Sequence, residues 1–290
     1  MYTIFVDTDL DITPSIASKY GFKIISMPYI INDKVYYPYK DSDTIDFDKF
    51  YNLLRSGVVP KTSSINIGEY IEYFEPELQK GNDILYIHFS SSMSGTFKIM
   101  DMAIKELKEK YPDRRIETID TLSITIGGLS IVEDIGDYYL SGEYDLDQLI
   151  AYAKTIIQHY TVYFFATDLK FFKKSGRISN FAGFMGDLIG LKPIIYIDKT
   201  GKMVTIDKAR GIKQVISKIF DYIKKVQLDI EKYRIIVTHS GAENEVELVK
   251  RKLKEKYGDN LNIQLMYVNP TIASHCGPNC LGVSFHCKRR

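Results

Sequence analysis

Three loops rich in small hydroxyl residues are the segments of this sequence best suited to bind a ligand. They cover residues 60–64 (PKTSS), 90–96 (SSSMSGT) and 274–278 (SHCGP). Each loop lies at the end of an apolar run that predicts a strand, or beside such a run. In open α/β sheets, ligands bind at the carboxyl ends of the strands. The loop from Ser90 to Thr96 follows such a strand directly, so it is correctly placed for binding.

A predicted helix after the second loop indicates which ligand it favours. Apolar residues recur at helical spacing from Phe97 to Leu107, and Ser94 or a neighbour is expected to cap that helix. Unpaired N–H groups and a partial positive charge at a helix N-terminus favour a carboxylate or a phosphate. Capping of the helix without any ligand stays open as the simpler interpretation.

Covalent catalysis has little support in the same loop. Ser92 and Ser94 lie in S-M-S-G, which lacks the G-x-S-x-G nucleophile elbow, and no triad spacing is present. The glycines at 127–128 and 183–186 match neither G-x-G-x-x-G nor the P-loop. The alternative hypothesis is an enzyme that uses the loop from Ser90 to Thr96, either a serine-dependent acyl-hydrolase or an enzyme with a phosphate ligand.

Charged segments offer two further candidates for binding. The basic residues at 173–177 and 208–210 are suited to an anionic partner, although solvated turns carry the same residues. The acidic segment 7–11 lacks the glycine and the distal glutamate of a calcium loop. Its aspartates are therefore expected to cap a helix rather than to bind a metal.

Composition narrows the class of protein. The chain has 290 residues, 45% of them hydrophobic, and 38 Lys plus Arg against 37 Asp plus Glu, so its net charge is +1. This balance is typical of a folded protein and argues against a nucleic-acid binder that relies on phosphate contacts. No apolar run approaches the ~18 residues of a membrane span, and no basic signal region begins the chain. We expect a cytoplasmic protein without stable membrane insertion.

Cysteine usage agrees with a reducing compartment. The three cysteines, Cys276, Cys280 and Cys287, are an odd number and cannot form a closed set of disulfides. Their spacing, C-x3-C-x6-C, lacks the paired C-x2-C knuckles of a structural zinc site. Ordinary thiols and no metal are therefore expected.

Alternating strands and helices must position the three loops. Short runs that are apolar on both faces predict buried strands, and amphipathic segments between them predict helices. This alternation is typical of a parallel sheet built by right-handed crossovers. The predicted strands cover residues 4–7, 84–90, 116–120 and 161–167, and predicted helices cover residues 47–54 and 146–157.

The second half of the chain has a different pattern. Two apolar runs separated by a Gly-containing loop predict a β-hairpin, and a strongly periodic helix follows. We predict two α/β domains: residues 1–167 with a mainly parallel sheet and flanking helices, and residues 168–290 as a smaller mixed α/β domain. No linker separates them, so we expect a substantial interface. The predicted elements are the hairpin 193–198 with 203–207, the helix 212–223 and the strands 233–239, 263–268 and 282–287.

A series of short motifs, taken in order, makes the chain resemble the bacterial DegV family of fatty-acid-binding proteins. Each motif alone is weak, but together they span nearly the whole chain. The motifs are Val6-Asp7-Thr8 with Asp11, Pro60-Lys61-Thr62-Ser63, Ser94-Gly95-Thr96-Phe97, Ile119-Asp120-Thr121, Leu169-Lys170 with Lys174 to Ser179, Lys192-Pro193-Ile194, Lys208-Ala209-Arg210, and His275-x-Gly277-Pro278-x-x-Leu281-Gly282.

The resemblance implies both a fold and a function. Members of the family bind a long-chain fatty acid in a buried tunnel between two α/β domains. Some present its carboxyl group to a separate fatty acid kinase, which makes an acyl phosphate for phospholipid synthesis. By similarity, Thr62, Ser94 and His275 would bind the carboxylate, and Arg177 and Arg210 would face the kinase. The chain is then expected to be a non-catalytic carrier of an acid such as palmitate, with no other cofactor.

Apolar residues that follow the basic loop at 173–177 are candidates for the wall of this tunnel, although core packing gives the same spacing. They are Phe181, Phe184, Met185, Leu188 and Ile189. At ~0.8 kcal/mol per buried methylene, a fourteen-methylene chain gains about 11 kcal/mol before the costs of binding. An apolar tunnel would therefore retain a lipid strongly.

Overall fold

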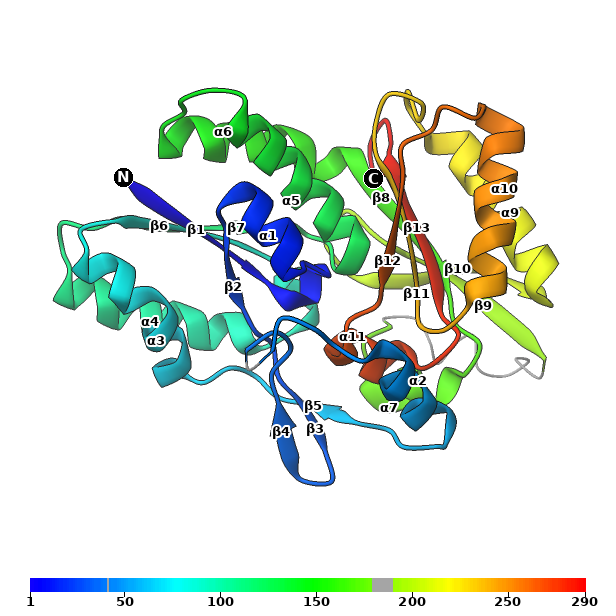
Figure 1. Cartoon of the computed structure of the whole chain (residues 1–290), viewed down its shortest axis with the longest axis horizontal. Coiled ribbons are helices and arrows are strands. Elements are labelled where there is room, and N and C mark those ends of the chain that lie inside the picture. The colour runs from blue at the N-terminus through cyan, green and yellow to red at the C-terminus, as the bar shows by residue number, and fades with distance from the viewer. Residues whose placement is uncertain (41, 179–189) are drawn as a thin grey trace.

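The first half of the chain forms a parallel sheet (Figure 1). The computed structural model describes residues 1–40, 42–178 and 190–290. All neighbours in this four-stranded sheet are parallel, in the order β2-β1-β6-β7. The predicted strands at 4–7, 84–90 and 116–120 are therefore confirmed. The strands are β1 (Tyr2–Asp7), β2 (Lys23–Ile25), β6 (Asp83–His88) and β7 (Ile116–Asp120).

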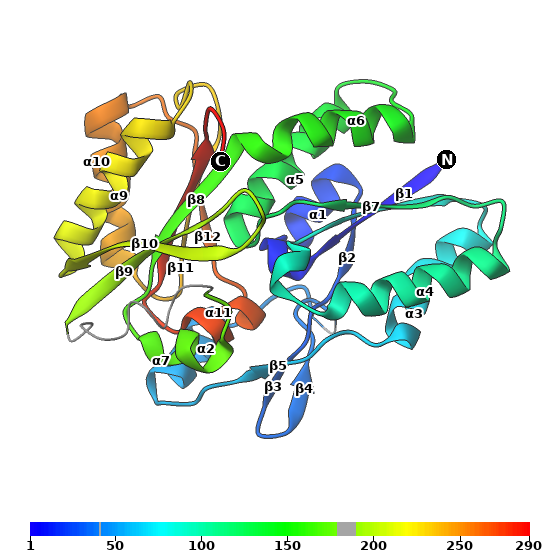
Figure 2. The same cartoon turned by 180° about the vertical axis from the view of Figure 1, so that it is seen from behind.

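Helices cover both faces of the parallel sheet, as Figures 1 and 2 show. Helices α3 and α4 pack together on one face, and α1 and α5 lie on the other. The helix predicted at 146–157 is confirmed as α6. The bounds are α1 (Pro14–Tyr20), α3 (Ile67–Gln79), α4 (Thr96–Lys110), α5 (Thr125–Leu140) and α6 (Leu146–Ile156).

Helix α5 joins the two halves of the molecule. It contacts the turn after β1 on one side and the larger sheet of the second half on the other. Gly127 and Gly128 make this close approach feasible. A Cβ atom on Gly128 would lie 2.1 Å from Leu10 Cδ2, and one on Gly127 would lie 3.0 Å from Val162 Cγ1. Side chains at either position would push the helix away from its neighbours.

A six-stranded mixed sheet dominates the second half, in the order β10-β9-β8-β13-β11-β12. The predicted hairpin is confirmed, because β9 and β10 pair in antiparallel fashion. Helices α9 (Ile212–Val226) and α10 (Glu243–Tyr257) pack on this sheet and bury a second apolar core. The strands are β8 (Tyr160–Phe165), β9 (Leu191–Ile197), β10 (Met203–Arg210), β11 (Ile235–His239), β12 (Ile263–Tyr267) and β13 (Leu281–His286).

Strand β8 belongs to this larger sheet. The domain boundary predicted from the sequence, at residue 167, includes the strand at 161–167 in the N-terminal domain. The hydrogen-bonded neighbours of β8 are β13 and β9, both antiparallel to it. Divided by sheet membership, the chain therefore passes to the second sheet before Tyr160. Apolar periodicity reports that a strand is buried but carries no information about its partner.

A segment of the first half also packs on the second half. After β2 the chain forms the small antiparallel sheet β4-β3-β5 and the helix α2, which confirms the helix predicted at 47–54. The Tyr51 hydroxyl on α2 donates to the Val268 carbonyl oxygen at 2.7 Å, and Arg55 donates to the Gly241 carbonyl at 2.7 Å. The bounds are β3 (Tyr29–Ile31), β4 (Lys34–Tyr36), α2 (Phe47–Arg55) and β5 (Lys61–Thr62).

The apolar core runs through both sheets. The larger cluster of buried residues includes Val6 and Ile87 of the parallel sheet together with Ile195 and Ile236 of the mixed sheet. The substantial interface predicted between the two halves is therefore present. In the described part of the chain, none of the helices is long and apolar enough to traverse a membrane.

Candidate functional site

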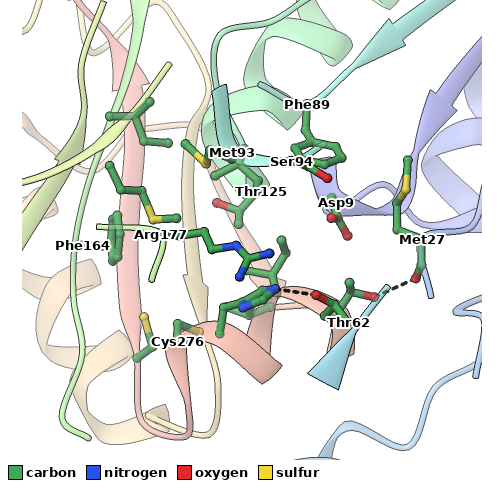
Figure 3. Close-up of a pocket in the computed structure, with 18 of the residues that line it drawn as sticks. Asp9, Met27, Thr62, Phe89, Met93, Ser94, Thr125, Phe164, Arg177 and Cys276 are labelled. Atoms are coloured by element: carbon green, nitrogen blue, oxygen red, sulfur yellow. Dashed lines mark hydrogen bonds between the residues drawn. The ribbon is translucent and has the colours of Figure 1, made fainter. Parts of the chain in front are cut away.

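A pocket lies where the carboxyl ends of β1 and β6 meet the mixed sheet (Figure 3). Asp9 and Phe89 follow those two strands, and Val162 and Phe164 of β8 face them across the pocket. The pocket holds about 890 Å³ of space not filled by protein atoms, its mouth included. This position is the one at which open α/β sheets bind their ligands.

Most of the pocket wall is apolar. Figure 3 shows Ser94, Asp9 and Thr62 on one side, here called the polar side, together with the apolar Met27 and Phe89, and it shows Phe164 and Cys276 opposite. A mostly apolar wall with a few hydrogen-bonding side chains matches an elongated apolar ligand with one polar end. The apolar lining residues include Met27, Phe89, Met93, Ile124, Val162, Phe164, Phe172, Ile197, Met203, Val268 and Ile272.

Two of the residues predicted to bind the carboxylate group of the ligand, Thr62 and His275, meet at the polar side of the pocket. Thr62 Oγ1 and His275 Nε2 form a hydrogen bond of 3.0 Å (Figure 3). Burial, with a smaller contribution from the charge of Arg177, lowers the pKa of His275 to about 4. The imidazole is therefore neutral at pH 7, and it carries one N–H donor and one acceptor nitrogen.

The short helix α11 (Pro270–Cys276) carries His275 and is fixed by the loop after β1. Asn269 caps α11, and its side chain also donates to the Thr8 carbonyl at 2.6 Å and to Asp11 Oδ1 at 3.0 Å. Thr271 donates to the Met27 carbonyl oxygen at 2.8 Å. These buried bonds hold α11 against the loop after β1, so that His275 reaches Thr62 of the first half of the chain.

Ser94 lines the pocket, whereas other hydroxyls of its loop bind the protein itself. Ser90 Oγ donates to the Gly201 carbonyl at 2.8 Å, and Ser92 Oγ donates to the Thr200 carbonyl at 2.7 Å. Figure 2 shows the β9–β10 loop reaching this point. Ser91 Oγ donates to Asp120. These three hydroxyls are therefore engaged in holding the loop against its neighbours.

The local backbone places Ser94 at the start of a helix. Gly95 takes the N-cap position of α4 and supplies no side-chain cap, and Ser94 Oγ accepts the Thr96 N–H at 3.2 Å. The predicted cap in this region is confirmed, with Gly95 as the neighbour that occupies it. The Thr96 N–H is thus bonded within the loop, and the Lys98 N–H donates to the Gly95 carbonyl oxygen, so few N–H groups of the first turn of α4 are left for a ligand.

Asp9 is a pocket residue that the sequence analysis did not select. The acidic segment was expected only to cap a helix, and Asp7 does cap the 3₁₀ turn Thr8–Leu10 by accepting the Asp9 N–H at 3.0 Å. Asp9 itself lines the pocket and is 6% exposed. A buried aspartate beside an apolar cavity is unusual, but composition alone does not separate it from its neighbours Asp7 and Asp11.

The two predicted partner-facing arginines have different positions. Arg177 is exposed, lines the pocket and donates to the Ser175 carbonyl oxygen. Arg210 is exposed at the end of β10 and is not among the residues that line the pocket. The predicted tunnel residues Phe181, Phe184, Met185, Leu188 and Ile189 lie outside the described residues.

Thr125 lines the pocket with an unusual backbone conformation. Its φ angle is 51°, in the left-handed region, which a β-branched residue rarely adopts. Such a conformation costs on the order of 1–3 kcal/mol, and strained residues cluster at ligand sites. Thr125 is the first residue of α5, so the strain lies where this helix meets the pocket.

Two of the three cysteines contribute thiols to the pocket wall. All three are buried and free, and Cys276 and Cys280 both line the pocket. A hydrogen bond with Cys280, together with burial, raises the pKa of the Cys276 thiol well above its usual value. Within residues 1–40, 42–178 and 190–290, no group of His, Cys, Asp and Glu is arranged to hold a metal ion.

The fold and the pocket define an α/β protein with two main sheets and a mostly apolar ligand pocket where they meet. The chain belongs to the DegV family, because the family model described as "Uncharacterised protein, DegV family" matches residues 1–288. A DegV domain-containing protein of Clostridium perfringens is 30% identical over 284 residues, 98% of this chain and 97% of that protein. One of Streptococcus pyogenes is 29% identical over 97% of this chain and 96% of its own length.

Solved structures share the fold across the whole chain. A stearic-acid-binding protein from Eubacterium ventriosum has a TM-score of 0.86 at 19% identity and covers 99% of both chains. A fatty-acid-binding DegV family protein from Thermus thermophilus has a TM-score of 0.84 at 21% identity, with the same coverage. A DegV family protein from Eubacterium eligens, loaded with heptadecanoic acid, has a TM-score of 0.83 at 16% identity and covers 99% of this chain and 100% of that one. At these identities the likeness establishes the fold.

Proposed function

We propose that this protein binds a long-chain fatty acid, such as palmitate, in the pocket between its two main sheets. The observation that carries the proposal is the composition of the pocket wall, which is mostly apolar and includes the hydrogen-bonding side chains of Thr62, Ser94 and His275. The fatty acids bound by the proteins from Eubacterium ventriosum and Eubacterium eligens support the same ligand class.

The carboxylate is assigned to Thr62, Ser94 and His275. Burying a carboxylate is costly unless hydrogen bonds replace its water. Two hydroxyl groups, a neutral imidazole and the N-terminus of α4 can supply donors without a fixed counter-charge. Arg177 is the one Lys or Arg among the described lining residues, and it is exposed, so the arrangement favours hydrogen bonds over a buried ion pair.

The protein is further proposed to present the bound carboxyl group to a fatty acid kinase and to act itself as a non-catalytic carrier. Exposed Arg177 and Arg210 are suited to the acidic side chains or phosphate groups of such a partner. The hydrolase alternative receives no specific support, because the hydrogen bond of Ser94 Oγ is to a backbone N–H and His275 Nε2 contacts Thr62.

Mass spectrometry under denaturing conditions tests the proposed ligand. Protein purified without added lipid is expected to release a long-chain fatty acid, and delipidated protein should bind palmitate at a stoichiometry of one. A shorter acid such as butyrate is the matched control, since it has the same carboxylate but little apolar surface. Absence of both a released acyl chain and saturable palmitate binding would disprove the proposal.

A further inference from the structure

Asp9 combines features that are rarely found together in a pocket wall. Its side chain is 6% exposed and lines the pocket on the side of Thr62 and Ser94 (Figure 3). Its Oδ1 atom is fully enclosed and makes no hydrogen bond to any described residue. An enclosed carboxyl oxygen without a partner is costly in a protein interior. Within the described part of the chain, Asp9 Oδ1 is therefore a buried polar atom without a hydrogen-bond partner.

Among the residues that the structure describes, the charged groups that shift the pKa of Asp9 are both acidic. Asp7 and Asp11 lie on the same loop, and Tyr70 of α3 and Tyr86 of β6 interact electrostatically with Asp9. Asp7 accepts hydrogen bonds from the Tyr86 hydroxyl and from the Phe89 N–H, both at 3.0 Å, and Asn269 bonds to Asp11. Both neighbours thus have partners that Asp9 lacks.

Four titratable groups among the described lining residues come from other elements than the loop of Asp9: His275 and Cys276 of α11, Cys280 and Arg177. His275 is neutral at pH 7, the pKa of the Cys276 thiol is raised well above its usual value, and Arg177 is exposed. None of the four is among the groups that shift the pKa of Asp9. Burial, together with the charges of Asp7 and Asp11, raises the pKa of Asp9 well above its usual value. The surroundings of Asp9 thus favour its neutral carboxylic acid form, which has an O–H donor.

We propose that the protonated carboxyl group of Asp9 is a further specificity-determining group, which donates its O–H to the carboxylate of the bound fatty acid so that the two carboxyl groups share one proton. This inference rests on the proposed function, because it uses the same ligand and the same side of the pocket. Two like charges at hydrogen-bond distance would repel each other, whereas an acid and a carboxylate form a strong, short hydrogen bond.

A shared proton links ligand binding to pH. Where Asp9 is protonated in the free protein, the carboxylate binds without net proton uptake. At higher pH, Asp9 ionises in the free protein, and each binding event must take up one proton from the solvent. Affinity for the carboxylate then falls by up to tenfold per pH unit. A hydrogen bond from an amide or a hydroxyl has no such dependence.

The test compares the wild type with Asp9→Asn, whose amide group keeps the shape and a donor but does not titrate. Titration calorimetry with dodecanoic acid below its micelle concentration gives the dissociation constant from pH 6.5 to 10. Asp113→Asn, an exposed acid outside the pocket, is the matched control. The ligand titrates identically in every sample. The ratio of the wild-type affinity to the affinity of Asp9→Asn at each pH therefore reports the effect of the titration of Asp9.

We expect the wild type and Asp113→Asn to lose at least tenfold in affinity at the alkaline end relative to Asp9→Asn. Proton uptake by the wild type, measured in two buffers of different ionisation enthalpy, should approach one per ligand there, which is a result independent of any variant. Parallel pH profiles for wild type and Asp9→Asn, with dodecanoic acid still bound, would overturn this inference alone. Failure of the wild type to bind the acid at every pH would overturn the proposed function as well.

Discussion

Thr62 and His275 are 213 positions apart in the chain, yet Thr62 Oγ1 lies 3.0 Å from His275 Nε2. The contact exists because β5 belongs to a segment of the first half that packs against α11. The neutral imidazole and the hydroxyl together form a pair of adjustable donors and acceptors at the polar side of the pocket. Removal of either group is expected to leave the other without its partner.

Replacement of Thr62 by valine keeps the side-chain shape but removes the hydroxyl. A hydrogen bond to a charged group contributes ~1.5–3 kcal/mol, so palmitate affinity should fall roughly 10- to 100-fold. Titration calorimetry on delipidated protein measures the change. Thr62→Ser, which retains the hydroxyl, should stay close to the wild type. Equal affinities for the valine and serine variants would remove Thr62 from the carboxylate site.

Ser94→Ala should weaken palmitate binding by a similar factor, since it removes a donor at the pocket. Ser92→Ala is the control in the same loop, because Ser92 donates to the Thr200 carbonyl and does not line the pocket. Neither the wild type nor the variants is expected to cleave p-nitrophenyl palmitate. Turnover by the wild type that Ser94→Ala abolishes would instead support the hydrolase hypothesis.

Met203→Phe should shorten the acyl chain that the pocket accepts. Met203 is buried, lies at the start of β10 and lines the apolar part of the pocket. A rigid ring there occupies space that the tail would use, so affinity for stearate should fall about tenfold or more relative to dodecanoate. Competition binding with the two acids gives this ratio. The volume-conserving change Met203→Leu should leave it nearly constant.

The pH dependence of stability should reveal the buried carboxyl group of Asp11. Burial raises the pKa of Asp11 to about 7 from 3.8, so its favourable contribution, complete below pH 3.8, is lost as the pH rises to about 7. Asn keeps the acceptor for Asn269 and tolerates the left-handed backbone, where φ is 52°.

Asp11→Asn should therefore gain about 2–3 kcal/mol in free energy of unfolding relative to the wild type between pH 5 and pH 8. Urea denaturation at the two pH values measures the difference. His275 and Asp7 titrate in both proteins, so their contributions cancel in the comparison. Asp9 loses in the variant the charge of Asp11 that raises its pKa, which adds to the gain in the same direction. If the difference in free energy of unfolding between the wild type and Asp11→Asn stays constant with pH, Asp11 does not titrate as described.

Charge reversal distinguishes the proposed roles of the two exposed arginines, Arg177 and Arg210. Arg210→Glu should leave palmitate affinity within about twofold, because Arg210 does not line the pocket, but should slow phosphorylation of the bound acid by a fatty acid kinase. Arg177→Glu should weaken binding itself, because the new negative charge lies beside the carboxylate. Coupled assays with purified kinase measure the rate. An unchanged rate for Arg210→Glu would remove Arg210 from the partner surface.

Local pattern predicted the elements of this fold better than their partners. The run at 84–90 reads as a strand from its own residues, and β6 covers Asp83–His88. The run at 161–167 is also a strand, but its place beside β13 depends on residues more than a hundred positions later. Short-range periodicity contains no such long-range information.

The residues of the candidate site were likewise predictable only in part. Thr62, Ser94 and His275 were singled out because their motifs resemble a family, and the structure places all three in the wall of one pocket. Asp9 was overlooked because its role depends on burial and on the absence of a partner for Oδ1. Neither property can be predicted from its sequence neighbours, the aspartates Asp7 and Asp11 and the threonines Thr8 and Thr13.

The central place of β13 has a consequence for biosynthesis. This strand is made after every other strand of the mixed sheet, yet it lies between β8 and β11. Until the ribosome has delivered it, β8 and β11 expose their backbone hydrogen-bonding groups to water, and the sheet remains in two parts. The ribosome must therefore complete β13 before the pocket can close, and early termination before β13 would leave an aggregation-prone fragment without a complete pocket.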